Sequence, residues 1–232
     1  MWASRKIQTG LGILAGLLLL GACFGALYWL LMPQRFPVSG VEIKGPLKNT
    51  TRKQIEAALP RAAGNFFAVD LAEVRAGVER LPWVRHVAVR RVWPDRIEVT
   101  VEEHVALARW GDEALVNLQG EKFFAQTRET LPWFVAPAGS AAEVARRYRR
   151  FSEIVAPLGT RVDRVVLSPR HAWQLRLANG VHLMLGRDAD AAEARLRKFV
   201  DAYPASAAGK KHEYVDLRYP NGFALRVPDW KS

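Results

Sequence analysis

The hydrophobic residues of this chain form one long run and then many short blocks. From Gly10 to Met32 the chain is apolar and uncharged, and after it short stretches alternate between apolar and polar positions. As an α-helix the run would span about 34 Å at 1.5 Å per residue, enough to cross the hydrocarbon core of a bilayer. We therefore expect a single N-terminal transmembrane helix at residues 10–32, behind a short tail at residues 1–9.

The middle of this run permits a second interpretation. Residues 20–23, LGAC, follow a basic start and resemble the lipobox of bacterial lipoproteins, in which the chain is cut before the cysteine and lipidated. A cleaved apolar region needs only about 7 to 15 residues. Here the apolar residues continue beyond Cys23 and end in Tyr28 and Trp29, types that favour a membrane interface. We favour the anchor over a lipoprotein or an ordinary cleaved signal.

The charges beside the run predict its orientation. Arg5 and Lys6 precede it and only Arg35 follows closely, so the positive-inside rule places the N-terminal tail in the cytoplasm and exports the remainder. The single cysteine lies within the apolar run. The exported portion therefore has no disulfide and no cysteine metal ligand, and its folding depends on ordinary hydrophobic cores.

The first exported block predicts the order strand, helix, helix, strand, strand. Residues 38–44 alternate like a strand, and Thr51 has capping-box spacing for a helix that ends near Leu59. Asp70 begins a second helix, whose apolar positions at helical spacing are Leu71, Val74, Val78 and Leu81. Residues 83–103 predict a hairpin with one apolar face, formed by Val87, Val89, Ile97, Val99 and Val101. This order gives a three-stranded sheet covered by two helices.

Several separated motifs in this block carry a resemblance to a known family. In chain order they are VEIKG at 41–45, NFF at 65–67, LPWV at 81–84 and RVWPD at 91–95. Residues 64–110 as a whole resemble the POTRA domain of the FtsQ/DivIB bacterial cell-division proteins. The resemblance implies a βααββ POTRA domain at residues 36–104. Within it we interpret Phe66, Phe67, Trp83 and Trp93 as core and turn anchors rather than a platform for stacking a ligand.

The second exported block, residues 105–232, predicts a second mixed β domain, so that the fold class is α+β. Paired strands are expected within 105–110 and 114–125, with turns at 111–113 and at Gly120, and three further strands at 162–168, 173–178 and 181–185. Helices are expected to begin at Ser140, running to about Leu158, and at Asp190, ending near Tyr203 and Pro204. Four arginines on the first of these helices form either a solvated face or a site for an acidic partner, namely Arg146, Arg147, Arg149 and Arg150.

The chain closes with a predicted hairpin. One side of its first strand carries Val215, Leu217 and Tyr219, a turn is expected at Asn221 and Gly222, and one side of the last strand carries Phe223, Leu225 and Val227. The sequence YVDLRYPNGFAL also resembles the end of the β domain in the same family. The final strand is expected at a sheet edge, where its backbone groups are available to a partner.

Charge and residue chemistry argue against an enzyme. The net charge is +11, but the cations are dispersed, as on a solvated surface, and export disfavours nucleic acid. The histidines show no zinc spacing, no serine stands in GxSxG, and Glu102 and Glu103 are neighbours on a strand and point to opposite faces. We therefore expect no catalytic residue, no cofactor and no metal. A membrane-anchored peptidoglycan-binding or wall-active protein, which the positive charge would suit, is the alternative.

The resemblance implies a scaffold in the inner membrane at the division septum, with a cytoplasmic N-terminus and a periplasmic C-terminus. It also implies that the periplasmic domains bind the FtsB and FtsL pair, and we expect the mode to be addition of a partner strand to a free sheet edge. The predicted partner-binding residues are Arg218, Tyr219, Gly222, Phe223 and Arg226. The simpler alternative for these residues is a plain terminal hairpin with Tyr219 and Phe223 packed inward.

Overall fold

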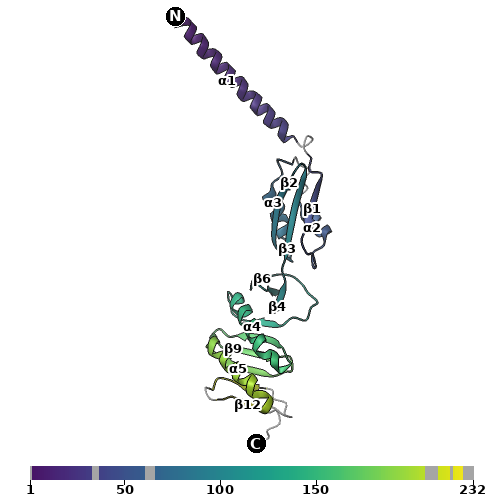
Figure 1. Cartoon of the computed structure of the whole chain (residues 1–232), viewed down its shortest axis with the longest axis vertical. Coiled ribbons are helices and arrows are strands. Elements are labelled where there is room, and N and C mark those ends of the chain that lie inside the picture. Colours follow the sequence, from purple (N-terminus) through teal and green to yellow (C-terminus); the bar gives the residue numbers. More distant parts are fainter. Residues whose placement is uncertain (1, 33–36, 61–65, 207–213, 220–221, 227–232) are drawn as a thin grey trace. The chain divides into compact units, whose positions relative to one another are not determined.

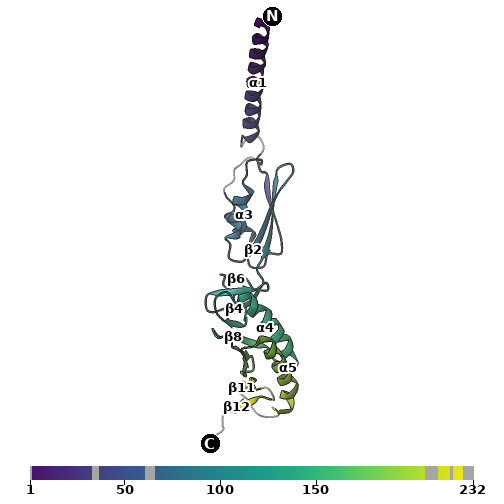
Figure 2. The same cartoon turned by 90° about the vertical axis from the view of Figure 1, so that its left-hand side faces the viewer.

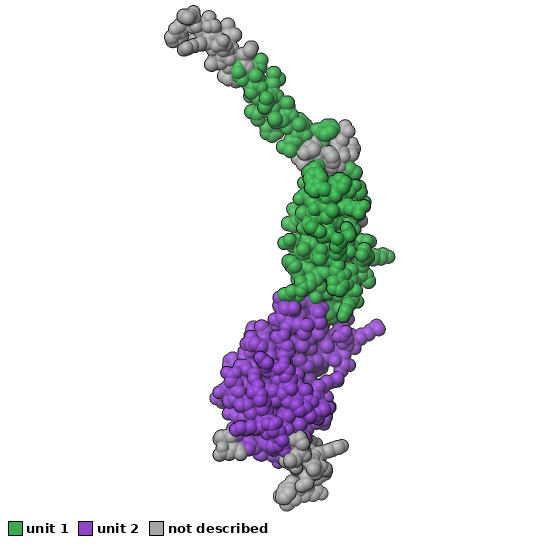
Figure 3. All heavy atoms as spheres, in the orientation of Figure 1, with its two compact units in different colours: residues 1–103 green, residues 104–232 purple. Residues whose placement is uncertain are grey.

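The structure is a computed structural model that describes residues 2–32, 37–60, 66–206, 214–219 and 222–226. The chain divides into two compact units, residues 1–103 and residues 104–232 (Figure 3). Each unit has a separate hydrophobic core.

The first unit begins with a helix, α1 (Trp2–Leu31), which is drawn in purple in Figure 1. Its described leucine side chains are all exposed, from Leu14 through the successive Leu17 to Leu20. Among the described residues, no helix satisfies both the length and the apolarity required of a membrane span. The transmembrane helix expected at residues 10–32 therefore stays a prediction.

The rest of the first unit has the predicted βααββ order. Its strands are β1 (Gly40–Lys44), β2 (Val84–Val92) and β3 (Arg96–Glu103), and its helices are α2 (Arg52–Ala58) and α3 (Leu71–Glu79). The sheet order is β1-β3-β2: β1 runs parallel to β3, and β2 and β3 form the antiparallel hairpin. Side chains from the sheet and both helices share one core, which includes Ile43, Ile55, Val78, Val87 and Val99.

Helices α2 and α3 both begin at the capping residues expected from the sequence. The Thr51 hydroxyl accepts a hydrogen bond from the Gln54 backbone N–H at 3.3 Å, and the Gln54 side chain accepts one from the Thr51 N–H at 2.8 Å. The Asp70 carboxylate accepts from the N–H groups of Ala72 and Glu73. These contacts satisfy backbone donors that have no partner within the first helical turn.

One glycine holds the end of β1 against β3. Gly45 has a φ of +123°, and a Cβ atom at this position would lie 2.1 Å from the Val101 carbonyl oxygen. Only glycine combines this backbone conformation with so close an approach. The glycine that ends the VEIKG motif is therefore required by the packing of the two strands.

A buried carboxylate lies on the other face of this sheet. The Glu98 side chain on β3 is 7% exposed and lies between Lys44 on β1, at 2.7 Å, and Arg90 on β2, at 2.5 Å. The hydrogen bonds from Arg90 and then Lys44 lower the pKa of Glu98 to about 2. The three strands are thus linked across this face by a network of charged side chains.

The second unit is built on a nine-stranded mixed sheet with the order β12-β11-β10-β9-β8-β7-β4-β5-β6. The strands are β4 (Ala106–Trp110), β5 (Ala114–Asn117), β6 (Lys122–Phe123), β7 (Trp133–Val135), β8 (Val162–Leu167), β9 (Trp173–Leu177), β10 (His182–Gly186), β11 (Tyr214–Asp216) and β12 (Ala224–Arg226). Strand β7 was not predicted. It pairs in parallel with both β4 and β8 and so joins two parts of the sheet.

Two long helices cover one side of this sheet, α4 (Ala141–Val155) and α5 (Ala189–Ser206), and a 3-10 turn at Ala156–Leu158 extends α4. Figure 2 shows them side by side along strands β8 to β12. Arg147 of α4 joins the helices through contacts to Glu193 at 2.7 Å and Asp190 at 2.8 Å. Of the four arginines predicted from the sequence, Arg147 is thus paired across the helices and Arg150 pairs with Glu153 on its own helix at 3.2 Å. Arg146, Arg149 and Arg150 are exposed.

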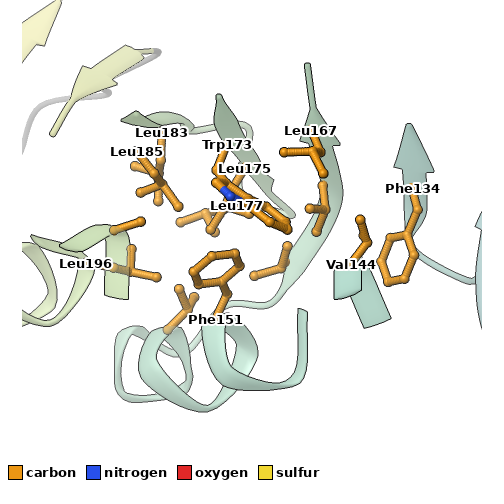
Figure 4. Close-up of a cluster of buried hydrophobic side chains, with 14 of the residues drawn as sticks. Phe134, Val144, Phe151, Leu167, Trp173, Leu175, Leu177, Leu183, Leu185 and Leu196 are labelled. Carbon is orange, nitrogen blue, oxygen red and sulfur yellow. The ribbon is translucent and has the colours of Figure 1, made fainter. Parts of the chain in front are cut away.

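The core of the second unit lies between these helices and the sheet. Figure 4 shows Phe151 of α4 facing Trp173 and Leu177 of β9, with Leu196 of α5 beside them. The rings of Phe151 and Trp173 meet edge to face with their centroids 5.6 Å apart, and both side chains are almost fully buried. Burial of such large side chains accounts for a fold without disulfides.

Several sequence predictions need correction here. The helix expected to start at Asp190 is capped by Asp188, whose carboxylate accepts from the N–H groups of Asp190 and Ala191. This helix continues through Pro204 to Ser206 instead of ending there. Ser140 precedes α4 as expected, but its hydroxyl donates to the Pro137 carbonyl and makes no side-chain cap. The start of each helix was easier to predict than the group that caps it, because nearby polar groups compete for the same hydroxyl or N–H.

Candidate partner-binding site

The predicted site lies at one end of the nine-stranded sheet, where the last two strands form an antiparallel hairpin. In this hairpin Val215 pairs with Leu225 and Tyr214 pairs with Arg226. Strand β12 is the terminal strand of the sheet order, so among the described strands its outer edge has no neighbour. The expectation of an edge strand is confirmed. Its backbone N–H and C=O groups on that side are available to a further strand.

Arg218 is held by a carboxylate two residues before it. Its guanidinium donates hydrogen bonds to both carboxylate oxygens of Asp216, with Nε to Oδ1 at 2.8 Å and Nη2 to Oδ2 at 2.5 Å. The Asp216 side chain is 9% exposed and that of Arg218 57% exposed. The bonds from Arg218 lower the pKa of Asp216 below its usual value. Asp216 therefore stays ionised and fixes an arginine whose outer surface is in solvent.

Tyr219 does not continue the apolar side of β11. Val215 and Leu217 are buried, but β11 ends at Asp216 and the Tyr219 side chain is 56% exposed. The alternation expected through Tyr219 was wrong at this residue because the strand pairing ends before it. An exposed tyrosine beside an open strand has the properties of a binding residue, since its ring offers apolar area and its hydroxyl a hydrogen bond.

Phe223, in contrast, packs partly into the core. Its ring meets that of Phe199 on α5 edge to face at 5.4 Å, and Phe199 is fully buried. The inward packing that we weighed for both aromatic residues therefore describes Phe223 and not Tyr219. Phe223 positions the hairpin on α5 and contributes only its remaining exposed surface to a site.

The other two predicted residues, Gly222 and Arg226, lie just before β12 and at its end. A Cβ atom at Gly222 would meet nothing within 4 Å, so the backbone there borders open space. Arg226 lies in β12 opposite Tyr214, and its side chain is outside the described part of the structure. The expected turn at Asn221, and Val227 beyond the strand, also lie outside the described residues.

A pocket of about 420 Å³ opens between this segment and α5. Its lining comes from the helix and from the segment that joins β11 and β12: Arg195, Lys198, Ala202, Leu217, Tyr219, Gly222 and Phe223. Three of the five predicted residues therefore border one concave surface. Arg218 is close by, because a Cβ atom at Gly186 would contact both Arg195 Nη1 at 3.2 Å and Arg218 Cγ at 3.4 Å.

Sequence reasoning missed the contribution of α5 to this site. Arg195 and Lys198 are three positions apart and share a helix face, but nothing local connects them with a hairpin that follows more than a dozen residues later. Arg195 is also held in place, since its Nη1 donates to the Leu185 carbonyl at 2.9 Å. The site thus combines an open strand edge, an exposed tyrosine and a group of cations.

Comparison with known families accounts for both units. Residues 36–104 match the family model "POTRA domain, FtsQ-type", and residues 108–218 match "Cell division protein FtsQ/DivIB, C-terminal". A POTRA domain followed by this C-terminal domain defines a class of bacterial cell-division proteins. The second match ends at Arg218, so that Tyr219, Gly222, Phe223 and Arg226 lie beyond it.

Similar curated proteins extend over almost the whole chain. The cell division protein FtsQ of Burkholderia pseudomallei is 41% identical over 98% of this chain and 94% of its own length. The FtsQ protein of Nitrosospira multiformis is 40% identical over 97% of this chain and 99% of its own length. That of Escherichia coli is 34% identical over 85% of this chain and 75% of its own length. This chain belongs to the FtsQ/DivIB family of bacterial cell division proteins, as its motifs indicated.

Proposed function

We propose that this chain is a non-catalytic scaffold of the division septum, which is held in the inner membrane by α1 and binds other division proteins with the end of its second unit. The observation that carries the proposal is the site itself. An open strand edge, an exposed tyrosine and a basic pocket adjoin one another at β12 and α5. The family places the chain in cell division, and the site supplies a surface for binding there.

The anchor is supported by the surface of α1. Successive residues of a helix are about 100° apart, so Leu17, Leu18, Leu19 and Leu20, all more than half exposed, surround it completely. A helix that is apolar on every side needs an apolar environment. We propose that this environment is the inner membrane, with the tail that carries Arg5 and Lys6 in the cytoplasm, and with the sheet and helices that follow α1 in the first unit and the whole second unit in the periplasm.

The partners we propose are FtsB and FtsL, which the family resemblance implies. An extended segment of a partner would add to the outer edge of β12 through backbone hydrogen bonds. Its side chains would then contact Tyr219 and Gly222, and an acidic side chain would face Lys198 and Arg195 in the pocket. Arg218 and Arg226 would add positive charge along the same edge.

The test is co-purification of FtsB and FtsL with the full chain from detergent-solubilised membranes. Tyr219→Glu should reduce the recovered partner at least tenfold, because it places a negative charge beside the proposed contact. Phe124→Glu is the matched control, since Phe124 is 71% exposed in the same unit but far from β12 in the sheet order. It should leave recovery unchanged. Equal recovery with both variants would reject the site.

A second measurement tests the mode of binding. Hydrogen exchange of the residue 224–226 amides should slow when the partner binds, because added strand pairing protects N–H groups on the outer edge of β12. Loss of partner with unchanged exchange at these amides would argue for a side-chain contact without strand addition. Retention of the chain on isolated peptidoglycan in moderate salt, with no recovery of division proteins, would favour the wall-binding alternative.

A further inference from the structure

The first unit exposes an aromatic cluster that the proposed partner site does not use. Trp93 lies in the turn between β2 and β3 and is 71% exposed, so of the two expected roles it has that of a turn residue and not that of a core residue. Its ring centroid lies 5.3 Å from that of Phe66 and 5.6 Å from that of Phe67. Phe66 is fully buried beneath it. We call Phe66, Phe67 and Trp93 the aromatic tip.

The aromatic tip is fixed to the sheet by one arginine. Arg91, at the end of β2, donates from Nε to the Phe66 carbonyl at 2.9 Å and from Nη2 to the Val69 carbonyl at 2.7 Å, with a longer contact to the Phe67 carbonyl at 3.3 Å. These bonds hold the segment that carries both phenylalanines beside the turn. Trp93 is therefore supported from the protein side while its other surface faces solvent.

The segment that follows α1 in the chain is bonded to the turn that carries this tip. Ser39 donates from its backbone N–H to the Asp95 carbonyl at 2.9 Å and from its hydroxyl to the Asp95 carboxylate at 2.5 Å, and Gly40 pairs with Arg96. The turn that carries Trp93 is thus tied to Ser39, seven residues after Met32. Seven residues span about 25 Å at most when fully extended.

This tether favours one end of the sheet for contact with the bilayer. Strand β3 runs from Arg96, beside the tip, to Glu103 at the other end, and eight residues of strand cover about 26 Å. The aromatic tip adjoins Ser39, whereas the opposite end of the sheet, near Lys48 and Glu103, is about one strand length away from Ser39. The path from Met32 to the aromatic tip is therefore the shorter of the two. If α1 spans the membrane, the tip is the end of the sheet tethered next to the lipid headgroups.

We infer that the aromatic tip inserts into the interfacial layer of the same bilayer that holds α1. This inference rests on the proposed anchor. Tryptophan favours this layer because its ring is apolar and its N–H can still bond to water or headgroup oxygens. The exposed cations Arg91 and Arg96 flank the turn and would lie near lipid phosphates. The first unit is then held at the membrane by the chain and by a second, lipid-binding contact.

The experiment uses the full chain in nanodiscs of phosphatidylethanolamine and phosphatidylglycerol. Cys23, the single cysteine, is replaced by serine, and a nitroxide is attached at Ala68→Cys, an exposed position in the aromatic-tip segment. Lys48→Cys is the matched control at the other end of the same sheet, where the Lys48 N–H bonds to Glu103. Collisions with oxygen report lipid and collisions with a water-soluble nickel complex report water.

The expected result is a several-fold higher ratio of oxygen to nickel accessibility at residue 68 than at residue 48. Adding Trp93→Ser should reduce that ratio toward the control value, whereas Trp93→Tyr should retain most of it. Flotation of the same chains with liposomes tests the anchor separately. Flotation with equal ratios at both positions overturns the lipid contact and keeps the anchor, and failure to float overturns both. A label at residue 68 shielded from both reagents would indicate a protein contact and would also overturn the inference.

Discussion

Phe223 meets Phe199 edge to face at 5.4 Å, so the hairpin that carries the proposed site is attached to α5 by an aromatic pair. The neighbouring Tyr219 is 56% exposed and belongs to the surface. Two aromatic residues four positions apart thus have different physical roles, one in stability and one in recognition. Substitution by glutamate is therefore expected to have a different effect at each of the two positions.

Phe223→Glu should destabilise the second unit by about 2 kcal/mol or more, because it removes aromatic packing and places a charge against the apolar Phe199. Tyr219→Glu should change the free energy of unfolding by only about 0.5 kcal/mol, since the side chain is largely in solvent. Urea unfolding of the full chain, followed by hydrogen exchange of β11 amides, measures both. A larger loss of unfolding free energy for Tyr219→Glu than for Phe223→Glu would mean that Tyr219 belongs to the core.

Glu98 should make the stability of the first unit depend on pH. Its pKa is about 2 in the folded chain, below its ordinary value of 4.5. The ionised carboxylate therefore stabilises the fold above the ordinary value, and this contribution is lost as the pH falls from about 5 toward 2. Glu98→Gln should lower the urea midpoint at pH 7, and the difference from the unsubstituted chain should close by pH 2.

The matched control for this prediction is Glu102→Gln. Glu102 is on the same strand and pairs with Arg85 at 2.7 Å, but its side chain is 53% exposed. Exposed pairs contribute little because water screens them, so this variant should change the midpoint much less. The same midpoint difference for Glu98→Gln at pH 7 and pH 2 would show that the carboxylate charge is not what stabilises the sheet.

Gly45→Ala should destabilise the first unit strongly, by about 3 kcal/mol, because it combines a positive φ with a clash against backbone. The Val101 carbonyl oxygen, 2.1 Å from the added Cβ, cannot move without disturbing β3. Gly40→Ala lies in the same strand with nothing within 4 Å of its Cβ and should be nearly neutral. Thermal unfolding compares them, and similar melting temperatures would refute this account of the VEIKG glycine.

Asp216 and Arg218 should be energetically coupled. Asp216→Asn and Arg218→Gln should each weaken the second unit, and a double-mutant cycle should give a favourable coupling that is smaller than that of a buried pair, because Arg218 is half exposed. Partner recovery should fall in Asp216→Asn as well, although this side chain is buried. Additive effects on stability would mean that the carboxylate does not hold the arginine.

Local patterns were sufficient to predict most elements of the fold. The alternation of Val87 and Val89 with Ile97 to Val101 specified the β2–β3 hairpin and its register, because a shift by one residue would expose the whole apolar face. Thr51 and Asp70 likewise identified helix starts through contacts made within a few residues. These predictions succeeded because the forces involved act between residues that are close in sequence.

Long-range pairing was not predictable in this way. Strand β7 is three residues long, and it exists because β4 and β8 lie on both sides of it. The parallel pairing of β10 and β11 follows from α5 passing between them in the chain, and it brings Arg195 and Lys198 to the pocket. The exposure of Trp93 likewise depends on where Phe66 packs. The hydrophobic periodicity of a single segment does not indicate which distant segments pair with it or pack against it.

The short strand β7 has a mechanical consequence for a protein pulled from both ends. Among the strands that the structure describes, β12 and β11 connect to β4, β5 and β6 within the sheet only through the pairings of Trp133, Phe134 and Val135. Tension from a partner attached at β12 would reach the start of this unit through those few backbone hydrogen bonds and through the packing of α4. The resistance of the septal linkage to force would then depend on the weakest set of parallel bonds in the sheet rather than on the affinity of the partner.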